Sequence, residues 1–102
     1  MPEAVPTGAR RDGRVQLRLP VDLRTGSQVQ QIDDEAYTVD LSNLGIRVCT
    51  ILGLTPGETV TITTDDEKEQ AIPGRVVWVG SVGTVLEGQA GVEFLKPLFR
   101  PV

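Results

Sequence analysis

Short segments with an apolar residue at every second position follow one another along this chain. In the first, Val15–Leu23, the apolar side chains share one face: Val15, Leu17, Leu19, Val21 and Leu23. A period of two is the pattern of a β-strand that buries one face. Pro20 lies on the polar face of this segment and predicts an edge or a bulge, because proline has no N–H to donate. The chain therefore favours a sheet with one buried side.

Further strands are predicted along the rest of the chain, each separated from the next by turn signals. They are Ala36–Leu41, Leu44–Thr50, Val60–Thr64, the apolar 72–80 segment and the closing 91–97 segment. The Gly-rich segment 81–90 is either a short strand or a loop, and Pro56–Gly57 fits the centre of a type II turn. Six or seven short strands without a helical period indicate an all-β sandwich or a small closed barrel. A barrel would hide the strand edges of so short a chain.

The composition argues against an enzyme. The chain has no histidine and one cysteine, Cys49. This inventory removes histidine-based catalysis, makes a zinc site unlikely to form and excludes an internal disulfide. We therefore expect no catalytic residue, no metal and no cofactor. Cys49 lies in an apolar segment, which predicts a small buried side chain.

Charge distinguishes between classes of ligand. The net charge is −4 and only four residues are aromatic, so a barrel that binds nucleic acid is disfavoured. Five of the ten basic residues nevertheless lie in the first 24 positions: Arg10, Arg11, Arg14, Arg18 and Arg24. A local cationic patch on an acidic protein suits a small anion better than a polyanion.

Residues 1–9 are rich in proline, glycine and small side chains, and we expect a loose tail before a domain at 10–102. The N-terminus lacks the apolar stretch of a signal peptide. No apolar run approaches the roughly 18 residues of a membrane span. The interpretation is therefore a cytoplasmic protein without a membrane span.

Two polar clusters are candidates for a ligand site. Arg10 and Arg14 are four residues apart, and arginine forks can clamp phosphate or bond the edge of guanine. The second cluster is Asp40, Ser42 and Gly45. A carboxylate can accept from the N1–H and N2–H groups of guanine, and glycine lets a flat ring approach the backbone.

Each cluster also has an ordinary interpretation. The arginines could be solvated charges. The second cluster could be a turn in which Asp40 or Ser42 caps the backbone and Gly45 has a positive φ. Together, however, cationic forks and a guanine-reading carboxylate indicate an anionic guanine nucleotide.

The pair of motifs, Arg10-xxx-Arg14 followed by Asp40-x-Ser42-x-x-Gly45, resembles the signature of the PilZ domain family. The later GRVVWVG and GVEFL segments are also similar to that family, so the resemblance covers roughly residues 10–97. The resemblance implies a six-stranded antiparallel barrel that binds the bacterial second messenger cyclic di-GMP and is not an enzyme. Many members end in a helix after the last strand, for which this chain has little room.

The resemblance also implies roles for individual residues. Arg10 and Arg14 would hold guanine and phosphate, Asp40 and Ser42 would contact a guanine edge, Gly45 would leave room for it, and Arg11 would help electrostatically. Some members carry a basic residue before the first motif arginine and bind two stacked ligands. Ala9 here favours one copy, whereas Arg11 leaves two copies open. Trp78 is either a stacking platform or, as its apolar neighbours favour, a core residue.

The implied protein is a cytoplasmic bacterial receptor, a monomer or weak dimer. Its N-terminal segment would be drawn onto the barrel by the ligand and would signal to a protein partner. The alternative is a PilZ-like structural or protein-docking module that does not bind nucleotide. That alternative usually comes with loss of the motif residues, and this chain has all of them.

Overall fold

The computed structural model describes residues 15–26, 29–64 and 70–96. These ranges contain no helix and seven strands: β1 (Val15–Gln16), β2 (Pro20–Thr25), β3 (Ile32–Leu41), β4 (Gly45–Cys49), β5 (Thr59–Thr64), β6 (Ala71–Val79) and β7 (Gln89–Phe94). The predicted tail at 1–9 lies outside the described residues, as do Arg10, Arg11 and Arg14.

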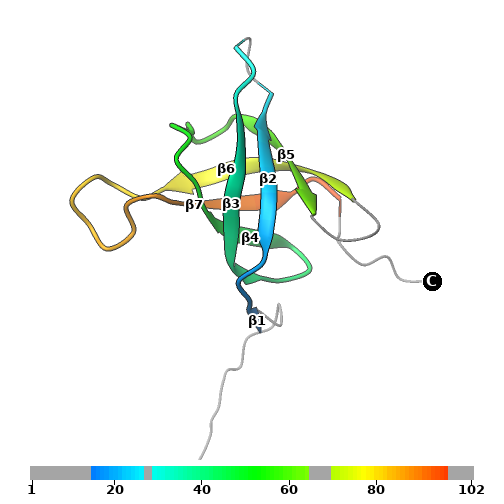
Figure 1. Cartoon of the computed structure of the whole chain (residues 1–102), viewed down its shortest axis with the longest axis horizontal. Coiled ribbons are helices and arrows are strands. Elements are labelled where there is room, and N and C mark those ends of the chain that lie inside the picture. The colour runs from blue at the N-terminus through cyan, green and yellow to red at the C-terminus, as the bar shows by residue number, and fades with distance from the viewer. Residues whose placement is uncertain (1–14, 27–28, 65–69, 97–102) are drawn as a thin grey trace, which may run out of the picture.

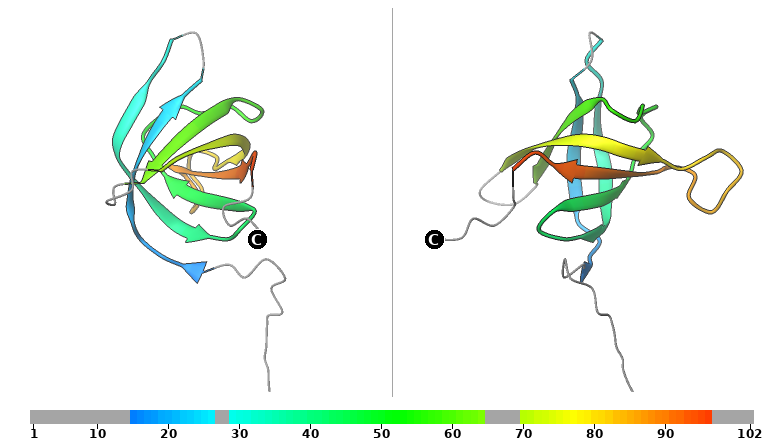
Figure 2. Two further views of the ribbon diagram at one scale, coloured as in Figure 1. Left: turned by 90° about the vertical axis from the view of Figure 1, so that its right-hand side faces the viewer. Right: turned by 180° about the vertical axis from the view of Figure 1, so that it is seen from behind.

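The strands form one sheet that closes on itself (Figures 1 and 2). The strand order is β1-β3-β2-β5-β6-β7-β4, and an additional pairing of β3 with β4 completes the ring. All pairings are antiparallel. Strands β2–β7 are thus a six-stranded barrel, which confirms the predicted all-β fold, and the short β1 is added to β3 beyond the start of β2.

The core is aliphatic and lies inside the barrel. Its most deeply buried large side chains are Leu23, Ile62, Val48 and Val76, from four different strands. Removing such apolar surface from water is the main favourable term in folding. Along β2, the buried Val21 and Leu23 alternate with the half-buried Asp22 and the exposed Arg24, which is the period of two seen in the sequence.

The predicted strand Val15–Leu23 is correct only in its second half. Val21 and Leu23 are buried, but Val15, Leu17 and Leu19 are exposed. Residues 17–19 leave the strand, and the Thr38 hydroxyl donates to the carbonyl of Leu17 and accepts from the N–H of Leu19. The Thr38 side chain thus takes the place of some of the backbone hydrogen bonds that would join the two strands before Pro20. As predicted, this proline stands at an irregular place, the first residue of β2 just before a register shift against β3.

Cys49 is half-buried rather than buried, so the prediction of a core thiol is wrong. It pairs with Tyr37 across β3 and β4, and a side-chain hydrogen bond between the two raises the pKa of the Tyr37 hydroxyl. Tyr37 in turn lies under the Arg18 guanidinium, 3.7 Å from its ring centre. Cys49 is therefore part of the outer surface of the sheet.

Two connections agree with the turn chemistry of the sequence. Thr55–Glu58 is closed by a hydrogen bond from the N–H of Glu58 to the carbonyl of Thr55, and Gly57 has φ 96°. This is the third position of a type II turn, where a positive φ requires glycine. Between β6 and β7 the Gly-rich segment is a loop, which decides between the two interpretations given above.

Hydrogen bonds to the Asp33 side chain connect the segment that follows β4 to the start of β3. Its carboxylate accepts hydrogen bonds from the Thr50 hydroxyl (2.6 Å) and from the N–H groups of Ile51 (3.1 Å) and Glu35 (2.9 Å). Burial acts to raise the pKa of this carboxyl, but these hydrogen bonds together outweigh it, and the pKa lies below its usual value.

We expect Asp33→Asn to lower the free energy of unfolding at neutral pH and to make stability less dependent on acid. Because the folded pKa of Asp33 is depressed, its stabilisation is fully present above the unfolded value of 3.8 and is lost as the pH falls through the lower folded value. Urea unfolding between pH 7 and pH 2.5 measures this. A gap between wild type and variant that stays constant down to pH 2.5 would contradict it.

Candidate functional site

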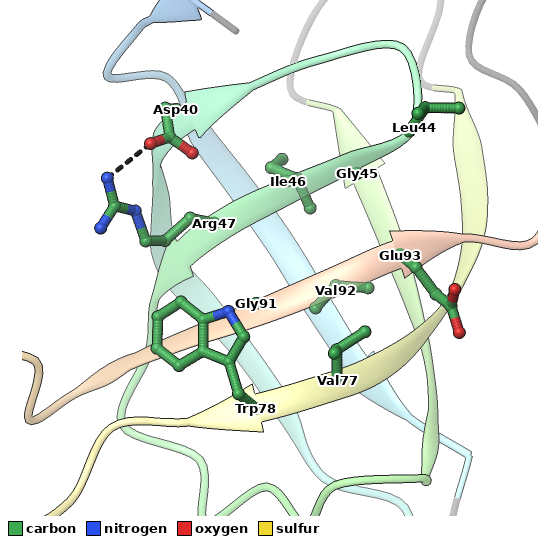
Figure 3. Close-up of a pocket in the computed structure, with 10 residues that line it drawn as sticks. All are labelled: Asp40, Leu44, Gly45, Ile46, Arg47, Val77, Trp78, Gly91, Val92 and Glu93. Atoms are coloured by element: carbon green, nitrogen blue, oxygen red, sulfur yellow. Dashed lines mark hydrogen bonds and ion pairs between the residues drawn. The ribbon is translucent and has the colours of Figure 1, made fainter. Parts of the chain in front are cut away.

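An elongated hollow of about 470 Å³ lies on the outside of the barrel, across β3, β4, β6 and β7 (Figure 3). Its polar side chains are Asp40 and Arg47 at one end and Glu93 at the other, and Trp78 forms part of its wall. Backbone at Gly45 and Gly91 lines it where side chains are missing. The hollow therefore offers both charges, an aromatic ring and accessible backbone.

Asp40 and Arg47 form an ion pair across the seam between β3 and β4. The guanidinium Nη2 lies 2.5 Å from Asp40 Oδ2. The Asp40 side chain is 9% exposed and that of Arg47 is 31% exposed. A carboxylate so far removed from water needs a charged or hydrogen-bonding partner to remain ionised. Arg47 provides that partner and is itself accessible from the hollow.

A β-bulge is responsible for this juxtaposition. The pairing of β3 with β4 shifts register between Thr38 and Asp40, so that Asp40 faces Arg47. Regular alternation over Ala36–Leu41 would put Tyr37, Val39 and Leu41 on one face, and the bulge breaks this alternation. Leu41 packs against the core, whereas Tyr37 meets Arg18 on the outside.

Trp78 is not a core residue, contrary to the interpretation that its neighbours favoured. The pairing of β6 with β7 shifts register between Val76 and Trp78. Val76 is buried, while Val77 and Trp78 both line the hollow. Gly91 makes room for the ring, because a Cβ there would lie 2.1 Å from Trp78 Nε1. A bulge and a glycine together thus lay an indole on the barrel surface.

Ser42 belongs to a tight turn between β3 and β4. Its hydroxyl oxygen accepts from the N–H groups of Leu44 (3.1 Å) and Gly45 (3.2 Å), and its own N–H donates to the Gly45 carbonyl. Ser42 is also 4% exposed. The turn interpretation is therefore correct for Ser42, whose hydroxyl organises the backbone next to the hollow.

Gly45 is glycine for a different reason from the one that the turn interpretation assumed. Among the described glycines, positive φ angles occur at Gly57, Gly83 and Gly88, and not at Gly45. A Cβ at Gly45 would instead lie 2.6 Å from the carbonyl oxygen of Val92. Gly45 therefore lets β4 and β7 approach closely at the floor of the hollow.

The first described strand runs beside Asp40. In the sheet, Val15 pairs with Leu41 and Gln16 with Asp40. The arginine motif precedes Val15 in sequence and lies outside the described residues.

Two residues of the hollow were not predicted as site residues: Arg47 was not considered, and Trp78 was favoured as a core residue. Arg47 could have been found, because a charged residue in an otherwise apolar strand points outward. Trp78 could not, since its direction depends on a bulge. Among the described residues, no group of three or more His, Cys, Asp or Glu is placed to hold a metal ion.

Comparison with known protein families identifies the family of the chain. A model of the PilZ domain matches residues 9–98 of the 102-residue chain. The chain belongs to the PilZ domain family. No curated protein gives a significant match over this sequence. PilZ domains are in general non-enzymatic receptors of cyclic di-GMP. The described ranges hold no helix that is long and apolar enough to cross a membrane.

We expect Gly45→Ala in this PilZ domain to lower the free energy of unfolding by about 1–3 kcal/mol, because the new methyl group would overlap the Val92 carbonyl of β7. Gly53→Ala is the matched control, since a Cβ there meets nothing within 4 Å. The control should change stability by less than about 0.5 kcal/mol. Thermal or urea unfolding without ligand measures both, and equal effects would contradict the close approach.

Proposed function

We propose that this PilZ domain is a receptor for cyclic di-GMP that binds it at the hollow beside Asp40. The observation that supports the proposal is the pairing of β1 with β3, in which Val15 and Gln16, the residues that directly follow the Arg10–Arg14 segment in sequence, lie opposite Leu41 and Asp40. In the proposed complex, one ligand contacts both the cationic forks of that segment and the carboxylate of Asp40. The family membership of the chain supports the same ligand.

The proposed contacts follow from the chemistry of each side chain. Arg10 and Arg14 hold phosphate and guanine, with Arg11 adding positive charge, because guanidinium groups make paired, charge-assisted bonds to such acceptors. Asp40 accepts from the N1–H and N2–H groups of one guanine. Ser42 and Gly45 shape the backbone on which this base rests.

Arg47 and Trp78 extend the proposed site. Arg47 forms an ion pair with Asp40, so a guanine that binds Asp40 must share or displace this partner. Once displaced, the guanidinium is free to follow a phosphate or a base edge within the same hollow. The indole of Trp78 offers a face on which a base can stack, an interaction that is typically worth about 1–3 kcal/mol per base.

The signal is a change of conformation and not a reaction. The nucleotide would draw residues 1–14 onto the barrel and so alter the surface that a downstream protein meets. Amide hydrogen exchange of this segment with and without ligand tests that step. The receptor would act in the bacterial cytoplasm as a monomer or weak dimer, without a cofactor.

We expect wild-type protein to bind cyclic di-GMP saturably in calorimetry and Arg14→Ala to weaken binding roughly tenfold to a hundredfold. The lost charge-assisted contact corresponds to about 1.5–3 kcal/mol. Arg24→Ala is the control, because Arg24 is also an exposed arginine but lies on β2 and does not line the hollow. A folded wild type that does not bind would favour the docking-module alternative.

The one tryptophan of the chain gives a second test. We expect cyclic di-GMP to change the emission of Trp78, because the indole lines the proposed site. Cyclic di-AMP should have a much smaller effect, since adenine lacks the N1–H and N2–H donors that Asp40 would accept. Asp40→Asn should reduce this preference for guanine. An equal response to both dinucleotides in wild type would contradict the role of Asp40.

A further inference from the structure

A second surface, beside the β6–β7 loop, differs in chemistry from the nucleotide hollow and shares no lining residue with it. Two hollows adjoin there and share the lining residues Thr50, Ile51, Glu87 and Gly88. One is bordered by the start of β3, and the other by the end of β6. Between them lie the segment after β4 and the β6–β7 loop, which projects from the barrel as the yellow-orange loop in Figures 1 and 2.

Aliphatic side chains on this surface stand almost completely in water. Ile51 is 89% exposed and Val82 is 87% exposed, and both line these hollows, while Val85, which is 94% exposed, belongs to the same β6–β7 loop as Val82. Single exposed aliphatic residues are ordinary on protein surfaces, but several beside adjoining hollows are typical of an interaction site. The hollow next to Val82 is floored by Leu54 and Ala90, which belong to the core.

Both segments that carry these side chains are held in place by hydrogen bonds. Ile51 is fixed through its N–H to the carboxylate of Asp33. In the β6–β7 loop the N–H of Gly83 donates to Glu87 Oε1 (2.9 Å), and the N–H of Glu87 donates to the Thr84 carbonyl (3.1 Å). The aliphatic side chains are thus presented on an ordered backbone, which reduces the entropy lost when a partner binds.

The rim of this surface is acidic. Asp34, Glu35 and Glu87 are exposed and line the shared hollows, and none of the described residues that line these hollows is a lysine or an arginine. A second copy of the same face would bring carboxylates against carboxylates, which opposes a symmetric dimer through it. Nucleic acid and anionic lipid are disfavoured for the same reason.

We propose that this surface docks a segment of another protein in which lysine or arginine residues flank aliphatic ones. The aliphatic side chains of that segment would cover Ile51, Val82 and Val85, and its cations would meet the acidic rim. Apolar burial supplies affinity, while complementary charge steers the approach and fixes the orientation. The proposal does not depend on nucleotide binding, because no residue of the Asp40 hollow takes part.

The test is a random displayed 12-residue peptide library selected on the full chain, followed by fluorescence anisotropy with the enriched peptides. We expect enriched peptides to combine Lys or Arg with aliphatic residues. The double variant Ile51→Ser with Val82→Ser, at two residues that line the hollows, should bind them at least about tenfold more weakly. Val29→Ser is the control, because Val29 is an exposed aliphatic residue on neither hollow, and it should bind like wild type.

Charge variants test the contribution of the acidic rim to binding separately from that of the exposed aliphatic side chains. Asp34→Asn with Glu87→Gln should weaken the same peptides and flatten the dependence of their affinity on salt, because screening acts on the removed charges. The proposal is overturned by peptides without basic residues, or by peptides that bind the Ile51/Val82 variant as tightly as wild type. It is also overturned if sedimentation shows self-association of wild type that this variant loses, since the occupant would then be a second copy.

Discussion

Closure of the barrel through β4 is the constraint on which the rest of this structure depends. β4 pairs with β3 on one side and with β7 on the other, so a five-residue strand joins the two ends of the sheet. Without it, β3 and β7 would each present an unpaired edge. Closure requires β4 to approach β7 closely, which explains why the residue that faces the Val92 carbonyl is the glycine Gly45. It also creates the seam across which Asp40 and Arg47 meet.

The hollow exists because two strands depart from regular pairing near this seam. The bulge between Thr38 and Asp40 turns a carboxylate toward Arg47, and the bulge between Val76 and Trp78 turns an indole onto the same outer surface. Bulges re-aim side chains and are frequent beside functional sites. Because aliphatic side chains fill the interior of the barrel, a ligand has to bind on its outer surface. The two bulges place polar and aromatic side chains on that surface.

Much of the fold was predictable because it rests on local patterns. Alternating apolar residues located the main strands, and Pro56–Gly57 identified a turn that Gly57 completes with a positive φ. Features that depend on register were not predictable. The exposure of Val15 follows from a break in the strand, and that of Trp78 follows from a bulge and from Gly91 on the neighbouring strand.

The candidate site, too, was predictable from the sequence only in part. Asp40, Ser42 and Gly45 were recognisable by their spacing, but their separate physical duties were not. Ser42 organises a turn, Gly45 permits strand contact, and Asp40 is held by a partner, Arg47, that only the pairing of β3 with β4 reveals. The arginine segment precedes the described residues, and only the two residues of β1 that follow it are seen to pair with β3 near Asp40.

The proposed nucleotide site and the proposed docking surface use different residues and are joined by one hairpin. The acidic rim formed by Asp34 and Glu87 would repel an anionic nucleotide and attract a basic peptide. Yet β6 carries Trp78 on the first surface and leads directly into the loop of Val82 on the second. A ligand that moved the strand at Trp78 would therefore act on the backbone that presents the docking loop, without passing through the core of the barrel.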